Sequence, residues 1–260
     1  MKSFTRALLY SFVFLTGAAG LIYQVVWQQY LSRIIGNEHA ATALVLAIFL
    51  GGLAGGYLLS GALSRRAWNP LLVYAILEVI IALWAVSFPI FFKLVDLATS
   101  GWSFAMPWWM LIQGSFVTLV LILVPTLCMG GTVPLLTRAI SESVEQATRI
   151  HARVYAINTL GAFVGALGAG FAFVPWLGLP GTICMAAWMN FGAATYFGLL
   201  ARRRRTPKRS EDPAAETHPR RYPVIVLCLV AFLSGAYVMT LENVLIRNTD
   251  LALGPSIYSF

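Results

Sequence analysis

Long runs without a charged residue constrain the fold of this chain most strongly. Residues 7–32 carry no charge, and a second uncharged run extends over the 48 residues from 154 to 201. A helix needs about 20 apolar residues to cross a hydrocarbon core of about 30 Å. Hydrophobic residues make up 59% of the chain and charged residues 11%, far from the composition of soluble domains. The sequence therefore predicts an all-α, polytopic membrane helix bundle.

Seven stretches are long and apolar enough to span a bilayer. They cover residues 7–31, 40–63, 70–92, 108–127, 154–174, 181–201 and 222–246. The segment PWLGLPG at 175–181 is rich in glycine and proline and predicts the turn that splits the 48-residue run into two helices. The first run is too long for the apolar region of a signal peptide, so we expect it to remain as the first span.

The distribution of Lys and Arg indicates how these spans are oriented. If the N-terminus lies inside, 15 of the 18 basic residues fall on the inner side, and only Arg33, Lys93 and Arg247 fall outside. Short cytoplasmic loops collect Lys and Arg, so we expect a multi-pass protein of the inner membrane with a cytoplasmic N-terminus. The net charge of +8 then reflects topology. Because the basic residues form no continuous stripe, no nucleic acid is expected as a partner.

Two predicted cytoplasmic connectors differ from the tight turns elsewhere. Residues 138–153 (RAISESVEQATRIHAR) combine helical propensity with mixed charge and predict a surface helix beside the membrane. Residues 202–221 are rich in Arg and Pro and predict a flexible basic linker. Its four consecutive arginines could contact anionic lipid, although a topology signal is the favoured interpretation. The linker divides the chain into a six-span membrane half, 1–201, and a segment 222–260.

The first span has a counterpart near the end of the chain. Residues 14–36 (FLTGAAGLIYQVVWQQYLSRIIG) are similar to residues 232–254 (FLSGAYVMTLENVLIRNTDLALG). A single offset of 218 residues aligns Phe14 with Phe232 and Gly17 with Gly235. We therefore interpret 222–260 as the first span of a second repeat, of which the chain contains little more than this span. We expect the chain to be a fragment of a longer protein.

Glycines recur at four-residue spacing in two predicted spans. Residues 51–56 (GGLAGG) contain two overlapping GxxxG pairs, and 161 and 165 form another pair. Small residues on one helical face let helix backbones approach closely in lipid. We therefore predict helix packing at Gly51, Gly52, Gly55, Gly56, Gly161 and Gly165. A nucleotide-binding loop is not indicated, because no strand precedes these glycines and no acidic partner follows.

The fourth predicted span ends in PTLCMGGTVP at 125–134, where two prolines flank two glycines. A proline removes a backbone hydrogen bond from a helix. The sequence therefore predicts a kinked or unwound, broken-helix segment at Pro125, Gly130, Gly131 and Pro134. Broken helices line substrate sites in transporters. A bend without any ligand is an equally favoured interpretation.

Polar residues inside the predicted spans are candidates for function, because ionisable groups are costly in lipid. Gln24 and Gln28 lie one turn apart, and Glu242 occupies the repeat position of Gln24. Asn190 is a further amide inside a predicted span, and Arg247 could pair with Glu242. The candidate intramembrane polar pathway comprises Gln24, Gln28, Glu78, Gln113, Asn158 and Glu242. Alternatively, the amides hold helices together and Glu78 is a neutral, hydrogen-bonded carboxylic acid.

No constellation typical of catalysis or metal binding is present. The histidines His39, His151 and His218 fall in separate loops or linkers. The cysteines Cys128, Cys184 and Cys228 show no CxxC spacing, which argues against a disulfide framework and a zinc site. We therefore expect no catalytic site, no metal site and no cofactor within these 260 residues.

Five segments resemble the membrane region of fused major-facilitator-like/spermidine-synthase-like proteins. They are residues 14–36, 73–89 (VYAILEVIIALWAVSFP), 125–138 (PTLCMGGTVPLLTR), 153–182 (RVYAINTLGAFVGALGAGFAFVPWLGLPGT) and 232–247. The resemblance covers nearly the whole chain. It implies a polytopic region, similar to major-facilitator transporters, followed by a soluble aminopropyltransferase-like domain that would use decarboxylated S-adenosylmethionine and putrescine. That domain is absent here, so no catalytic residue can be carried over.

The resemblance sets the leading functional hypothesis. The chain is expected to be the membrane portion of a spermidine-synthase-like protein, with the lipid bilayer, the missing repeat and the soluble domain as its partners. A polyamine or other cationic small molecule could interact with Glu78 and Glu242. The loop 56–66 is similar to a major-facilitator motif, but Ser60 occupies its acidic position. A major-facilitator-like transporter and a non-catalytic scaffold subunit are the alternatives.

Overall fold

The computed structural model describes residues 3–35, 38–63, 69–99, 107–141, 143–203 and 223–253, and every regular element in these ranges is a helix. The chain divides into two compact units, Met1–Thr206 and Pro207–Phe260. The first unit contains α1 (Ser3–Ile35), α2 (Glu38–Leu63), α3 (Pro70–Thr99), α4 (Pro107–Ile140), α5 (Val144–Gly168), the π-helical segment η1 (Ala169–Phe173) and α6 (Val174–Arg203). The second unit contains α7 (Val224–Leu253).

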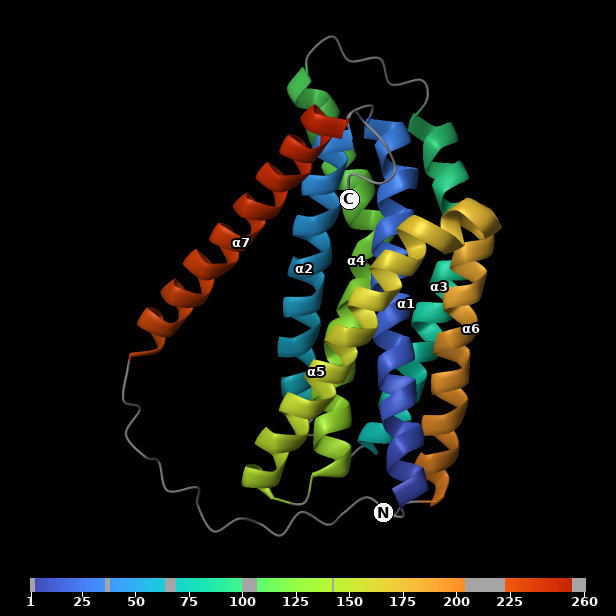
Figure 1. Cartoon of the computed structure of the whole chain (residues 1–260), viewed down its shortest axis with the longest axis vertical. Coiled ribbons are helices and arrows are strands. Elements are labelled where there is room, and N and C mark those ends of the chain that lie inside the picture. The colour runs from blue at the N-terminus through green and yellow to red at the C-terminus, as the bar shows by residue number, and fades with distance from the viewer. Residues whose placement is uncertain are drawn as a thin grey trace. The chain divides into compact units, whose positions relative to one another are not determined.

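The helices of the first unit run side by side along its length (Figure 1). Helix α1 contacts α2, α3, α4, α5 and α6, so it is the central helix of this unit. The all-α prediction is confirmed. Of the predicted linker 202–221, the structure describes Arg202 and Arg203, which end α6. The rest of the linker lies outside the described residues.

Several segments are suited to a membrane in length and composition. Among the described residues, five are long and apolar enough to cross one: Arg6–Ile35, Ala41–Gly61, Pro70–Thr99, Ile112–Ile140 and Glu145–Arg203. A shorter apolar stretch, Cys228–Val238, lies in α7. These helices are consistent with a membrane protein, as the charge-free runs predict.

The turn predicted for residues 175–181 is found at Gly178. This residue has φ 66° and ψ 175°, a backbone conformation that side chains with a Cβ rarely adopt. The amide of Val174 donates to the carbonyl of Ala169, five residues earlier, so the helix widens before Pro175. After the turn, Thr182 Oγ1 donates to the Gly178 carbonyl at 2.7 Å. The chain therefore changes direction between α5 and the main part of α6 (Figure 1).

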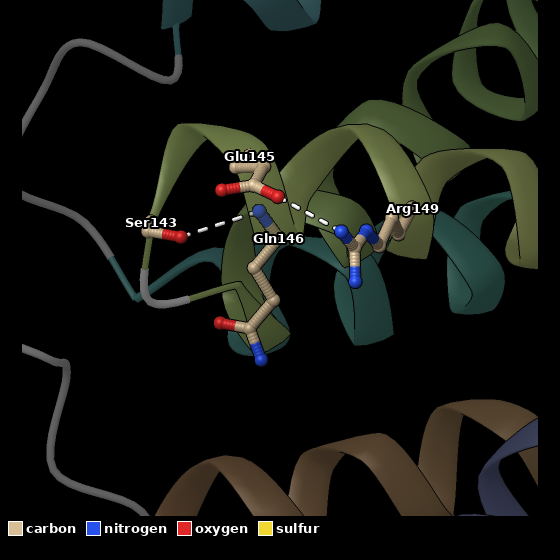
Figure 2. Close-up of polar contacts among 4 residues, drawn as sticks. All are labelled: Ser143, Glu145, Gln146 and Arg149. Atoms are coloured by element: carbon tan, nitrogen blue, oxygen red, sulfur yellow. Dashed lines mark hydrogen bonds and ion pairs between the residues drawn. The ribbon is translucent and has the colours of Figure 1, made fainter.

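Residues 144–153 are the first turns of α5, so the prediction of a separate surface helix is wrong. Ser143 caps the helix, because the amide of Gln146 donates to its Oγ at 3.2 Å (Figure 2). Arg149 pairs with Glu145 four residues earlier at 2.8 Å, and both side chains are exposed (Figure 2). No glycine or proline follows until Gly161. The helix therefore continues into the apolar segment, and its mixed charge marks an exposed helix end.

Helix α4 is one α-helix that runs through both of its prolines, so residues 125–134 are not unwound, whereas a kink at this segment stays a prediction. Residues 107–140 form one α-helix that includes Pro125 and Pro134. Proline at 125 removes the bond that the carbonyl of Leu121 would otherwise accept. The indole Nε1 of Trp84 on α3 donates to this carbonyl at 2.8 Å. A neighbouring helix thus replaces the lost bond, and the backbone stays helical.

Glycines allow α2 and α4 to touch through their backbones. A Cβ added at Gly52 would overlap the Thr126 side chain, and one added at Gly56 would overlap the carbonyl of Leu127. In return, a Cβ at Gly130 would overlap the carbonyl of Leu53. Among the helix pairs that the structure describes, these two have the most extensive contact. The two prolines of α4 therefore flank a close backbone contact with α2.

The α1–α5 contact is built in the same way. A Cβ at Gly161 would overlap the carbonyl of Phe14, and one at Gly165 would overlap that of Ala18. On the α1 side of the same contact, a Cβ at Gly17 would overlap the carbonyl of Asn158. Of the other predicted packing glycines, Gly55 lies against the Leu127 side chain, whereas Gly51 has no neighbouring atom within 4 Å of the Cβ position.

Candidate functional site

Helix α3 carries a carboxyl group on its buried face. Glu78 is 1% exposed. The buried residues of α3 recur three and four positions apart, which is the spacing of one helical face. They include Leu71, Tyr74, Ala75, Glu78, Ile81, Ala82, Ala85, Phe88 and Phe92. The carboxyl group therefore points into the unit from the middle of an otherwise apolar and aromatic stripe.

Asn190 on α6 connects Glu78 to Tyr23 on α1. Its Nδ2 donates to Glu78 Oε2 at 2.5 Å, and its Oδ1 accepts the hydroxyl proton of Tyr23 at 2.8 Å. Asn190 is 2% exposed and Tyr23 is fully buried. Two consecutive hydrogen bonds therefore join α1, α3 and α6 inside the unit, where such bonds are shielded from water.

A second pair of hydroxyl groups lies next to the same carboxyl group. Thr16 Oγ1 donates to the carbonyl of Val13 at 3.1 Å, and it lies 3.4 Å from the Tyr74 hydroxyl. Either hydroxyl group can be the donor in that contact. Tyr74 also interacts with the carboxyl group of Glu78, one turn further along α3. We call Thr16, Tyr23, Tyr74, Glu78 and Asn190 the polar layer.

Two hydrophobic clusters enclose the polar layer. One cluster contains Trp27, Ile81 and Phe88, and the other contains Leu9 and Phe197. On each of the three helices, a polar residue marks the change from one cluster to the other. The flanking pairs are Val13 and Ala19 around Thr16, Ala75 and Ile81 around Glu78, and Ala186 and Ala193 around Asn190. The layer is therefore a polar cross-section within an apolar core.

An aromatic stack extends from the layer along α1. The rings of Tyr23 and Trp27 are stacked with centroids 5.3 Å apart, and Trp27 stacks on Phe88 of α3 at the same distance. Two buried polar atoms in this region have no hydrogen-bond partner, Trp27 Nε1 and Glu78 Oε1. Buried polar atoms are nearly always paired, so each unpaired atom needs an explanation.

Among the residues that the structure describes, no positively charged group is found to interact with Glu78. Glu145 and Arg149 form an ion pair on the exposed end of α5. The polar groups that face Glu78 are the amide of Asn190, the hydroxyls of Tyr23 and Tyr74, and the thiol of Cys128 on α4. A carboxyl group in this setting can hold a proton, or it can supply the negative charge for a cation that reaches it.

The structure does not connect the other predicted polar residues to Glu78 by hydrogen bonds among the described side chains. Gln28 Nε2 donates to Thr42 Oγ1 at 2.7 Å and so links α1 to α2. Gln24, Gln113 and Asn158 are partly buried. The side chain of Glu242 lies outside the described part of the structure. A continuous polar pathway therefore stays a prediction.

Sequence reasoning missed the hydroxyl groups of the layer. Tyr74 lies four residues before Glu78, so it shares a helical face with the carboxyl group, and this spacing could have indicated it. Tyr23 and Thr16 gave no such signal, because Tyr and Thr are common in apolar helices. Their meeting with Asn190 and Tyr74 depends on how α1, α3 and α6 are rotated against one another, which one sequence does not show.

Metal binding has no support in the described residues. No group of three or more His, Cys, Asp or Glu side chains lies close enough there to hold a metal ion. The cysteines at 128, 184 and 228 are free thiols.

One known protein gives a partial match to the chain. Polyamine aminopropyltransferase 1 of Streptomyces coelicolor is 27% identical over 174 residues. The match covers 66% of this chain but 30% of the relative, so this chain spans less than a third of that protein. No protein-family model matches the chain. No solved structure matches it either. The match supports a distant relation to spermidine-synthase-like proteins.

Proposed function

We propose that this chain is the membrane-embedded portion of a polyamine aminopropyltransferase-like protein and that it anchors a soluble enzyme domain outside these 260 residues. The observation that supports this most directly is the match of 66% of the chain to part of a polyamine aminopropyltransferase. The described helices add independent support, because five segments are long and apolar enough to cross a bilayer.

The test uses the complete coding sequence of which this chain is part. Membranes of cells that express it should transfer the aminopropyl group of decarboxylated S-adenosylmethionine to putrescine. Removal of residues 1–260 together with any membrane spans that follow them should move that activity to the soluble fraction. A complete coding sequence with no soluble domain, or activity that stays soluble while the helices are present, contradicts the anchoring role.

We further propose that the first unit is a six-span, major-facilitator-like half, and that α7 begins a second half. The pairing of helices supports this. Helix α1 packs on α5, and α4 packs on α2. If α1, α2 and α3 are matched in order with α4, α5 and α6, the α1–α5 contact corresponds to the α4–α2 contact. Such a correspondence is typical of halves built from two inverted three-helix repeats.

An inner-membrane location with the N-terminus in the cytoplasm accompanies this proposal. It is supported by the 15 of 18 basic residues that the topology places on the inner side. A tag at the N-terminus should be protected from protease in intact spheroplasts and cut after the membrane is permeabilised. Cleavage in intact spheroplasts contradicts this orientation.

Polyamine binding at Glu78 and Glu242 stays a prediction, as do transport and a scaffold role. In the conformation described here, protein atoms cover the carboxyl group of Glu78 almost completely. A polyamine could reach that group only if α1, α3 and α6 moved apart.

A further inference from the structure

The unpaired oxygen of Glu78 is the strongest unexplained feature of the described residues. Glu78 is 1% exposed, and its Oε1 has no hydrogen-bond partner, while Oε2 accepts from Asn190. An ionised carboxylate offers about four acceptor positions in its two oxygens. One donated hydrogen bond and a nearby tyrosine hydroxyl fill few of them. The ionised form of Glu78 is therefore poorly solvated in this place.

Within the described ranges, no neighbouring group compensates for a negative charge at this position. The titratable groups that face Glu78 are Tyr23 on α1, Tyr74 on its own helix and Cys128 on α4. On α6, Cys184 is exposed and interacts with Tyr23 only electrostatically. All four are neutral acids, and none can carry a positive charge. A buried charge without a partner is strongly unfavourable, whereas a neutral carboxylic acid is tolerated.

The donor and acceptor pattern leaves Glu78 Oε1 as the oxygen that can carry a proton. Tyr23 donates to Asn190 Oδ1, which turns Asn190 Nδ2 toward Glu78. Oε2 is therefore an acceptor, and Oε1 is the oxygen free to carry hydrogen. A proton needs no cavity, unlike a polyamine or a hydrated metal ion. A proton can therefore bind to Glu78 even though protein atoms surround its carboxyl group almost completely.

We propose that Glu78 is a proton-binding site, occupied in this conformation, and that its neutral carboxyl group fastens α1, α3 and α6 together through Asn190 and Tyr23. Release of the proton to water creates a charge that the layer cannot accommodate. The helices then separate enough to admit water or a cation. Proton occupancy thereby controls access to the polar layer. This inference does not depend on the aminopropyltransferase proposal.

Infrared spectroscopy of the purified full chain in lipid tests the proposal. A protonated carboxylic acid has a C=O stretching band that is separate from carboxylate bands. We expect this band at neutral pH, with its loss in Glu78→Gln. The matched controls are Glu145→Gln, which removes an exposed and ion-paired carboxylate, and Glu242→Gln, which removes the other acid of a predicted span. Both should retain the band.

A second variant distinguishes a bonded proton site from a merely buried acid. Asn190→Ala removes the donor to Oε2, so the band should persist at a shifted frequency. In Tyr23→Phe, Asn190 keeps its position beside Glu78, and a smaller shift is expected. If Glu78→Gln fails to fold, the wild-type band decides the matter, because it should fade as the pH is raised and the polar layer opens.

Three results would overturn the proposal. The first is the absence of a protonated carboxyl band in the wild-type chain. The second is loss of the band in Glu242→Gln while Glu78→Gln keeps it. The third is calorimetric binding of spermidine to the wild-type chain at neutral pH that Glu78→Gln abolishes, since a cation would then be the occupant. The pH dependence of thermal unfolding gives an independent check, because it should weaken in Glu78→Gln and persist in Glu145→Gln.

Discussion

The α2–α4 contact and the polar layer of α1, α3 and α6 hold helices together in different ways. In the first, Gly56 and Gly130 leave room for the partner backbone, and no side chain separates the helices. In the second, Asn190 and its partners join helices through hydrogen bonds at a level between two apolar clusters. A glycine contact is intolerant of added atoms, whereas a hydrogen-bonded layer is intolerant of a missing partner.

The largest expected effect comes from adding atoms to the glycine contact. In Gly56→Ala, the new Cβ overlaps the carbonyl of Leu127, so one helix must shift. Overpacking of this kind destabilises a fold by about 1 to 3 kcal/mol, and we expect the upper end here because the obstacle is backbone. Reversible unfolding in mixed micelles measures the change. Gly61→Ala on the same helix is the control, since no atom lies within 4 Å of its Cβ position. Equal effects of the two substitutions would contradict the close contact.

Removing a partner from the polar layer should have the next largest effect. Asn190→Ala leaves Glu78 Oε2 and the Tyr23 hydroxyl without their bonds, and each buried unpaired group costs about 1 to 3 kcal/mol. Hydrogen bonds between helices in membranes are often worth less, so we expect a loss of about 2 kcal/mol in total. The same unfolding assay applies. Asn158→Ala is the matched control, because this amide is partly buried on α5 and should cost little.

A smaller loss should follow from removing the bond that replaces the missing proline hydrogen bond. Trp84→Phe keeps an aromatic ring but leaves the carbonyl of Leu121 unpaired. We expect a loss of about 1 kcal/mol in unfolding free energy. Trp176→Phe serves as the control, since Trp176 is 80% exposed. An unchanged stability of Trp84→Phe would mean that the proline at 125 is tolerated without help from α3.

Local signals predicted the helices and the reversal between them. Charge-free runs indicated the apolar segments, and the glycine- and proline-rich stretch at 175–181 marked the turn that the structure places at Gly178. The same local reasoning failed at residues 125–134, because the donor that keeps α4 helical, Trp84, lies 37 residues before Leu121. It also failed at residues 144–153, since mixed charge indicates that a segment is exposed but does not show whether it is a helix of its own or the start of a longer one.

Helix rotation limited how much of the candidate site could be predicted. Glu78 was singled out because a carboxyl group is costly in an apolar span. Its neighbours Tyr23 and Tyr74 were missed, since their rings look apolar in a sequence and their hydroxyls matter only once three helices are assembled. The glycine pairs show the same limit. Spacing predicted both overlapping pairs in α2, yet Gly52 and Gly56 face α4 while Gly51 does not.

The smallest expected effect is a gain in stability, and it tests whether Gly51 lies on a different face of α2 from Gly52. Gly51→Ala adds a Cβ where no atom lies within 4 Å, so no clash opposes it. Alanine is favoured over glycine inside a helix by about 0.5 to 1 kcal/mol, chiefly because glycine loses more backbone freedom on folding. We therefore expect Gly51→Ala to raise the unfolding free energy by about 0.5 kcal/mol, whereas Gly52→Ala, one residue away, should lower it by overlapping Thr126. If both substitutions destabilise the chain, Gly51 also faces a close partner, and the contrast between the two faces of α2 is wrong.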